Sequence, residues 1–369
     1  MKESYSGSET AITALRGLYS GYGYTQFKMS KFEEYDLYLR NKDFLISDQV
    51  LTFTDLNGKL MALKPDVTLS IVKSMQSWQG GVKKLYYHEN VYRPAGGSRS
   101  FRELMQVGLE CLGDVGEYEV SEVLLLAAES LRNLSERWVL EISHLGILTE
   151  ALRASGLPEE RISEAGKVIG EKNLHELAAL CRDAGVSEEN AARLRALIST
   201  CGEAESTLPK LEKLLEGWVD PALIGELKRV LSAFSGTEAE KSLRLDLSSV
   251  SDLRYYNGVV MKGYVEGIPA AVLSGGSYDR LMKKMGREAK AIGFAVYLDL
   301  LERLDGDAPR YDADVLLLYE AGESPAVIRA CAERLRQEGK SVLVQPQVPA
   351  EIRVRETAKI QDGSVILLG

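Results

Sequence analysis

The chain has 369 residues, enough for two or three domains, and its 45% hydrophobic and 27% charged residues are ordinary for a globular protein. Its formal net charge of −9 disfavours a nucleic-acid partner, because affinity for phosphate backbones comes mainly from lysine and arginine. The N-terminal segment lacks the apolar core of a signal peptide, and no stretch is apolar over the roughly 18 residues that a membrane span requires. With four scattered cysteines and no paired spacing, the composition predicts a cytoplasmic protein with reduced thiols and no membrane segment.

The N-terminal part of the chain predicts a helix, a hairpin and a second helix. Apolar residues at helical spacing predict the first helix over residues 9–22. Residues 50–54 and 59–63 have the composition of two strands joined by a tight turn at Asn57-Gly58, since both turn residues tolerate a positive φ. A helix is expected over residues 67–75.

Two further strands are predicted over residues 82–87 and 104–111. Side chains of a strand alternate between its two faces. One face of the second strand is apolar and consists of Met105, Val107, Leu109 and Cys111. The other face then carries Gln106, Gly108 and Glu110, and two polar groups beside a glycine are suited to the floor of a ligand site.

The middle of the chain predicts a helix over 118–131 and a strand over 138–142. Between about 155 and 240 the composition shifts to Ala, Leu, Glu and Lys at helical spacing, which indicates an inserted helical bundle. Strands are then expected over four segments, with a Gly275-Gly276 turn and a helix before the last of them: 243–247, 258–265, 270–273 and 291–296.

The C-terminal part predicts a separate small α/β domain with parallel strand pairing. Its elements are strands over 313–318, 341–345 and 365–368 and a helix over 326–338. We therefore divide the chain into a core of residues 1–308, which includes the helical insertion, and a C-terminal domain of residues 309–369.

Four segments in order resemble motifs of the class II aminoacyl-tRNA synthetases, most closely those of the histidyl-tRNA synthetase family. They are Leu63–Thr68, Tyr87–Glu110, Asp252–Asn257 and Ser274–Asp279 leading to Gly293–Ala295. The resemblance extends from about Gly7 to Leu304. It implies an α+β fold with an antiparallel sheet flanked by helices.

The resemblance also implies an amino-acid pocket that binds histidine. In the family, the positions of Asp66, Thr68 and Gln106 surround the α-ammonium group, and a carboxylate at Glu110 faces the imidazole. The residues implied to bind histidine are Asp66, Thr68, Arg93, Gln106, Glu110, Tyr255, Tyr256 and Tyr278, with backbone from Gly275 and Gly276. Structural roles remain open for these positions: a helix N-cap for Asp66, solvated positions on a half-exposed sheet face for Gln106 and Glu110, sheet or core packing for the tyrosines, and a bulge or tight turn for the glycines.

The family uses charged side chains to activate an amino acid. Several of these are replaced in this chain. Ala95 replaces a glutamate, and Ser251 and Leu300 replace arginines. Each donor to a developing negative charge is worth roughly 10²–10³ in rate. Arg254 and Arg303 lie near the two lost arginines, but neither restores the expected geometry.

The chain therefore resembles the synthetase-like paralogues that regulate ATP phosphoribosyltransferase in histidine biosynthesis. The resemblance implies a subunit with no catalytic residue, cofactor or metal of its own, which binds histidine as a feedback ligand and pairs with a short-form catalytic subunit. It also implies a homodimer within a hetero-oligomer and no tRNA partner. The alternative is a divergent histidyl-tRNA synthetase that activates histidine with ATP.

Overall fold

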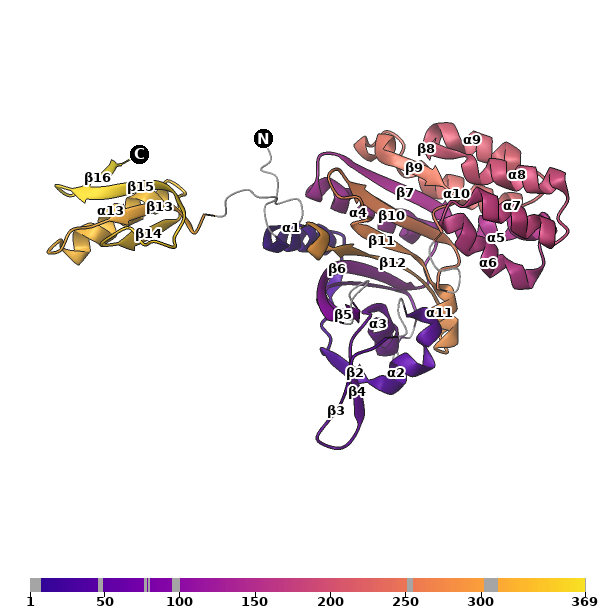
Figure 1. Ribbon diagram of the computed structural model, residues 1–369, viewed down its shortest axis with the longest axis horizontal. Coiled ribbons are helices and arrows are strands. Elements are labelled where there is room, and N and C mark those ends of the chain that lie inside the picture. Colours follow the sequence, from indigo (N-terminus) through magenta and orange to yellow (C-terminus); the bar gives the residue numbers. More distant parts are fainter. Residues whose placement is uncertain are drawn as a thin grey trace. The chain divides into compact units, whose positions relative to one another are not determined.

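The computed structural model describes residues 8–45, 49–75, 78, 80–94, 100–250, 255–301 and 311–368 (Figure 1). They fall into two compact units, one within residues 1–305 and the other within residues 306–369. The boundary expected at 308/309 lies outside the described residues. None of the described helices is both long and apolar enough to cross a membrane.

A nine-stranded sheet forms the centre of the larger unit. Its strands run in the order β1 (Thr25–Gln26), β5 (Val82–Pro94), β6 (Phe101–Gly113), β12 (Lys290–Tyr297), β11 (Leu273–Ser277), β10 (Val259–Val265), β7 (Trp138–His144), β9 (Leu243–Asp246) and β8 (Cys201–Glu203). The pairing is antiparallel from β5 to β7, whereas β1 pairs with β5 and β7 with β9 in parallel. The predicted sheet type is confirmed.

The two faces of the sheet pack against different helices, as the alternation in β6 predicts. On one face, Val107 and Leu109 join a core with helices α1 (Ser8–Gly21) and α4 (Glu117–Leu134). On the other face, Leu112 packs in a second core. That core includes residues of α2 (Tyr35–Arg40), the 3-10 turn η1 (Lys42–Phe44), α3 (Thr68–Ser74) and α11 (Asp279–Lys284). The second core surrounds the candidate site.

A small sheet of β2 (Phe32–Glu34), β4 (Leu60–Leu63) and β3 (Thr52–Thr54) projects from this second core. The hairpin of β3 and β4 was predicted, but its turn is built differently. Gly58 has a positive φ of 78°, whereas Asn57 is not among the positive-φ residues. Asp55 organises the turn because its Oδ1 accepts hydrogen bonds from the backbone N–H groups of Asn57 and Lys59, both at 2.8 Å.

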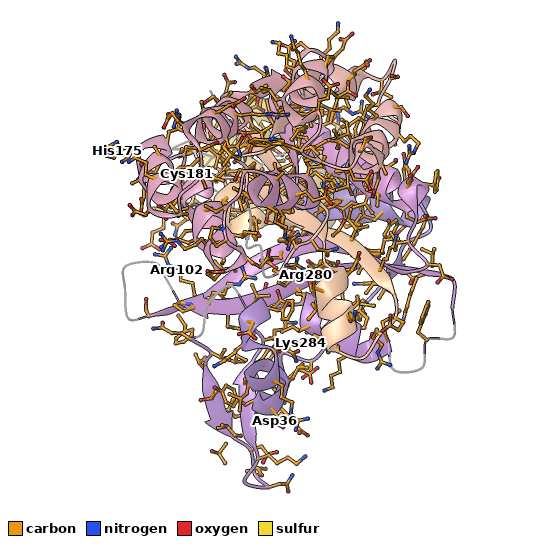
Figure 2. The ribbon with its side chains drawn as sticks, turned by 90° about the vertical axis from the view of Figure 1, so that its right-hand side faces the viewer. Asp36, Arg102, His175, Cys181, Arg280 and Lys284 are labelled. Carbon is orange, nitrogen blue, oxygen red and sulfur yellow. The ribbon has the colours of Figure 1, made fainter. Side chains whose placement is uncertain are left out.

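The helical insertion consists of α5 (Leu145–Ala154), α6 (Glu159–Gly170), α7 (Leu174–Asp183), α8 (Glu188–Ser199), α9 (Ala204–Leu215) and α10 (Pro221–Ser232), followed by the 3-10 helix η3 (Glu238–Ser242). It begins at Leu145, upstream of the predicted start near residue 155. Leu148, Ile162 and Leu194 belong to a separate core within it. Figure 2 shows the insertion, with His175 and Cys181, at one end of this unit and α2, with Asp36, at the other.

The C-terminal unit is a four-stranded sheet in the order β14 (Val342–Gln345), β13 (Ala313–Leu318), β15 (Val354–Gln361) and β16 (Ser364–Leu367), with helix α13 (Pro325–Gln337). Strand β13 pairs in parallel with β14 and β15, and β15 pairs antiparallel with β16. The sequence analysis missed β15, because only Ala358 and Ile360 of its central residues are buried apolar positions.

Candidate functional site

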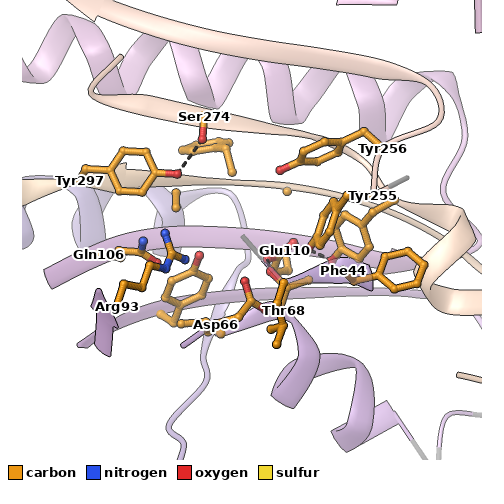
Figure 3. Close-up of a pocket in the computed structure, with 17 residues that line it drawn as sticks. Phe44, Asp66, Thr68, Arg93, Gln106, Glu110, Tyr255, Tyr256, Ser274 and Tyr297 are labelled. Carbon is orange, nitrogen blue, oxygen red and sulfur yellow. Dashed lines mark hydrogen bonds between the residues drawn. The ribbon is translucent and has the colours of Figure 1, made fainter. Parts of the chain in front are cut away.

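A cavity of about 300 Å³ lies on the sheet face opposite α1 and α4 (Figure 3). Its volume is at the lower end of the range for ligand pockets, which favours a small ligand. Its lining comes from segments far apart in the chain: Phe44, Leu45, Asp66, Val67, Thr68, Tyr87, Arg93, Gln106, Glu110, Tyr255, Tyr256, Ser274, Tyr278, Gly293, Phe294, Ala295 and Tyr297. All eight side chains implied to bind histidine are among them.

Strand register and two glycines create space for the pocket floor. Glu110 lies directly across from Gly293 in the pairing of β6 with β12. A Cβ atom at Gly293 would lie 1.8 Å from Glu110 Oε2, and one at Gly108 would lie 2.5 Å from the Tyr87 hydroxyl. Larger residues at either position would therefore displace a side chain that lines the pocket.

Glu110 is almost fully buried at the floor and is held by two hydroxyl groups. Thr68 Oγ1 donates to Glu110 Oε1 at 2.7 Å, and the Tyr278 hydroxyl donates to Oε2 at 2.6 Å. Burial raises the pKa of Glu110 to about 8, although these two hydrogen bonds oppose the rise. The pocket thus holds a carboxyl group that a nearby positive charge or N–H donor would help to ionise.

Asp66 and Arg93 lie beside this floor and have structural contacts as well. Asp66 Oδ1 accepts a hydrogen bond from the backbone N–H of Leu69 at 2.9 Å, so Asp66 both lines the pocket and satisfies an N–H of the first turn of α3, although the N-cap residue is Val67. Arg93 Nε donates to the carbonyl of Pro65 at 2.8 Å. Burial raises the pKa of Asp66, and the positive charge of Arg93 opposes that rise.

Aromatic rings form one wall of the pocket. The ring centroid of Tyr255 lies 4.6 Å from that of Tyr256 and 5.9 Å from those of Phe44 and Tyr278. The loops that carry these tyrosines are tied together, because the backbone N–H of Asp279 donates to Asn257 Oδ1 at 2.9 Å. Asp279 Oδ1 also accepts from the N–H of Ala291 on β12 at 2.9 Å, which anchors the wall to the sheet.

The opposite end of the pocket is rich in hydrogen-bond donors. Figure 3 shows Arg93, Gln106 and Tyr297 together there, away from Glu110 and Tyr255. Gln106 is buried, and its Nε2 has no hydrogen-bond partner among the described residues. The Tyr297 hydroxyl and Ser274 Oγ are 2.7 Å apart. A buried amide N–H without a partner destabilises the protein, so a ligand atom that accepts a hydrogen bond from Gln106 Nε2 would bind favourably at this end.

Some residues singled out by sequence lie elsewhere. Gly275 and Gly276 do not line the cavity; they lie within β11, where a Cβ at Gly275 would be 2.1 Å from the Gly293 carbonyl oxygen. The expected strand over 270–273 and glycine turn are therefore wrong: β11 covers Leu273–Ser277. Leu300 lies in α12 (Leu298–Leu301) and packs against the main core. Ala95, Ser251, Arg254 and Arg303 lie outside the described residues.

Nine lining residues were not among the predicted ligand contacts: Phe44, Leu45, Val67, Tyr87, Ser274, Gly293, Phe294, Ala295 and Tyr297. Tyr87 had a usable signal, because it shares strand parity with Arg93 on β5. Those on β11 and β12 reach the pocket through strand pairings between distant segments, whereas Phe44 and Leu45 reach it from the end of η1. Within the described residues, no group of three or more His, Cys, Asp or Glu could hold a metal ion.

The antiparallel sheet, with helices on one face and an amino-acid-sized polar pocket on the other, defines a class II aminoacyl-tRNA synthetase core. Residues 3–301 match the family model described as histidyl-tRNA synthetase. The fold is similar to the crystal structure of histidyl-tRNA synthetase from Nostoc, with a TM-score of 0.77, 18% identity and coverage of 93% of this chain and 83% of that one. It is also similar to a chain of an ATP phosphoribosyltransferase complex from Thermotoga maritima, with a TM-score of 0.63, 19% identity and coverage of 79% and 97%.

Curated relatives show to which subgroup of the family the chain belongs. The ATP phosphoribosyltransferase regulatory subunit from Moorella thermoacetica is 30% identical over 83% of this chain and 78% of that protein. The one from Oceanobacillus iheyensis is 25% identical over 99% of this chain and 89% of that protein. The chain therefore belongs to the histidyl-tRNA synthetase family and, within it, to the ATP phosphoribosyltransferase regulatory subunits. The family and fold class predicted from the four motifs are confirmed.

Proposed function

We propose that this regulatory subunit binds histidine in the pocket and transmits its occupancy to a short-form catalytic subunit of ATP phosphoribosyltransferase. The observation that carries the proposal is the position of Glu110, buried between the hydroxyls of Thr68 and Tyr278 and beside an aromatic wall. An imidazole ring placed against this wall donates its N–H to Glu110. The carboxylate then makes a charge-assisted hydrogen bond in a site shielded from water.

The rest of the pocket matches the remaining groups of an amino acid. Asp66 supplies negative charge for the α-ammonium group. Arg93 and Gln106 Nε2, which has no partner among the described residues, supply donors for the α-carboxylate at the opposite end, so we assign Gln106 to the carboxylate and not to the α-ammonium group that the resemblance implied. The two carboxylates and one guanidinium of the pocket thus complement a ligand with two cationic or donor groups and one anionic group, which is the charge pattern of histidine.

The same pocket lacks part of what activation requires. Leu300, at the position of a family arginine, packs its apolar side chain in the core and supplies no charge to a transition state. Histidine therefore acts as a ligand and not as a substrate. Regulation further requires that histidine bind the active and inhibited assemblies with different affinity. We infer a cytoplasmic complex built on a homodimer of this chain, without tRNA.

Calorimetric titration of the full chain with a matched ligand series tests the proposal. L-histidine should bind. L-phenylalanine, which has no ring donor for Glu110, and histamine, which has no carboxylate for Arg93, should each bind at least tenfold more weakly. Glu110→Gln should weaken histidine by roughly 100-fold, whereas Glu141→Gln on β7 of the same sheet, outside the pocket, should not change it. Equal binding of histidine and phenylalanine would refute the assignment of Glu110.

The alternative function is histidine activation with ATP, and the retained pocket residues favour it as the second candidate. It predicts histidine-dependent exchange of pyrophosphate into ATP. We expect no exchange above background from this chain, and robust exchange would establish a synthetase instead.

A further inference from the structure

Lys172 lies in the turn between α6 and α7 of the helical insertion and has an unusual backbone conformation. Its φ is 55°, and the other non-glycine residue with a positive φ among the described residues is Asp362. The backbone N–H groups of Lys172 and Asn173 bond to the carbonyls of Ile169 and Val168, as in a Schellman motif. Glycine is the usual residue at this left-handed position, so a lysine there needs a compensating contact.

That contact is an ion pair with the sheet. Lys172 Nζ lies 2.8 Å from Asp246 Oδ2 at the end of β9, and the side chain of Asp246 is only 3% exposed. The other oxygen of Asp246 accepts hydrogen bonds from the backbone N–H and the hydroxyl of Ser248, at 2.8 and 2.5 Å. One carboxylate therefore joins the insertion to the turn from which the chain continues toward Tyr255 and Tyr256.

Two further contacts tie this part of the chain to the insertion. Val250 packs against the core of the insertion, next to Gly170, where an added Cβ would meet Val250 Cβ at 3.5 Å. Beyond the tyrosines, the carbonyl of Gly258 accepts a hydrogen bond from the N–H of Leu145, the first residue of α5, at 2.9 Å. The tyrosine wall of the pocket is thus flanked on both sides by attachments to the helical insertion.

We propose that Lys172 and Asp246 are positioning residues. Their ion pair, called the latch below, holds the helical insertion against the part of the chain that leads into the tyrosine wall, so that ligand affinity depends on the position of the insertion relative to the sheet. This inference rests on the proposed function, because the ligand used to test it is histidine. When this ion pair is broken, the tyrosine wall spends a smaller fraction of the time in the conformation that binds the ligand. Apparent affinity falls in proportion to that fraction. Because the coupling between two binding sites is reciprocal, a partner that shifts the insertion changes the affinity for histidine, and histidine changes the affinity for that partner by the same factor.

Lys172→Gly separates the effect of the ion pair on ligand binding from any effect on the stability of the protein. Glycine removes the ion pair but relieves the left-handed strain, so the melting temperature should stay within a few degrees of that of the unmodified chain. Asp362→Gly is the matched control, because it relieves the same strain in the C-terminal unit. Lys172→Arg preserves the charge and should rescue binding. Val250→Ala loosens the same part of the chain independently of Lys172.

The measurement is the dissociation constant for L-histidine of each full-length variant, with its melting temperature. We expect Lys172→Gly and Val250→Ala to weaken histidine on the order of tenfold, and Lys172→Arg and Asp362→Gly to stay within threefold. If histidine binds the unmodified chain but both weakening variants bind it equally well, the latch is refuted and the proposed function stands. If the unmodified chain does not bind histidine, the proposed function fails and the latch fails with it.

Discussion

Replacing Glu110 with glutamine should stabilise the empty protein at alkaline pH. The pKa of Glu110 is raised from 4.5 to about 8 because the carboxyl group is buried, and a rise of this size corresponds to about 5 kcal/mol. Because the folded state holds the proton more tightly than the unfolded chain, this favourable contribution is complete below pH 4.5. It is lost progressively as the pH rises from 4.5 through 8.

Glutamine has no proton to lose, so the variant avoids this loss. At pH 9 its free energy of unfolding should exceed that of the unmodified chain by about 2–4 kcal/mol, somewhat less than the full shift because the hydroxyls of Thr68 and Tyr278 prefer a carboxylate acceptor. At pH 5 the two proteins should differ little.

The assay is thermal unfolding without ligand at pH 5, 7 and 9, for Glu110→Gln and for the control Glu141→Gln. The difference in midpoint between Glu110→Gln and the unmodified chain should grow by several degrees from pH 5 to pH 9, while the control follows the unmodified chain. Parallel pH profiles for all three proteins would show that Glu110 is not a buried carboxyl group that ionises at a cost, and the electrostatic account of the pocket would be wrong.

Three further substitutions test other parts of the structure. Asp279→Ala removes the hydrogen bonds that its carboxylate accepts from the Ala291 N–H and from the Asn257 side-chain amide. We expect about 2 kcal/mol lower stability and weaker histidine binding, measured by denaturant unfolding and calorimetry; unchanged binding would contradict the anchoring role. Gly293→Ala should abolish histidine binding or folding, because its Cβ would lie 1.8 Å from Glu110 Oε2, whereas Gly17→Ala on α1, with no atom within 4 Å of its Cβ, should be neutral in the same assays. Burial lowers the pKa of His144 from 6.5 to about 4, and its Nδ1 accepts from the N–H of Ile147, so the stability it supplies is present above pH 6.5 and is lost as the pH falls toward 4. His144→Asn keeps an acceptor that does not titrate, so its melting temperature should fall less than that of the unmodified chain between pH 7 and 5; equal falls would contradict this assignment.

The sequence alone predicted the polar face of β6 correctly, because strand alternation depends only on local geometry. Gln106 and Glu110 line the pocket, and Val107 and Leu109 enter the opposite core. The order of strands in the sheet could not be obtained from alternation and was not predicted; the resemblance to the synthetase family implied only that the sheet is antiparallel.

The predictions were incomplete or wrong where the outcome depends on contacts between segments that are far apart in the sequence. The role of Thr68 as a donor to Glu110 depends on the contact between the start of α3 and β6. Tyr297 and Ser274 meet across the pairing of β12 with neighbouring β11 and could not be associated from spacing. Gly275-Gly276 has the composition of a turn, yet it lies within β11, where the neighbouring backbone approaches too closely for any residue with a side chain.

Co-expression with a short-form catalytic subunit from the same genome shows whether histidine bound in this pocket changes the activity of the catalytic partner. The quantity to measure is the ATP phosphoribosyltransferase activity of the purified complex as a function of histidine concentration, with the unmodified chain and with Glu110→Gln. We expect that a complex forms in both cases, that histidine changes the activity of the unmodified complex, and that the Glu110→Gln complex needs roughly 100-fold more histidine for the same change. Failure to form a complex, or the same histidine response in both complexes, would contradict this expectation.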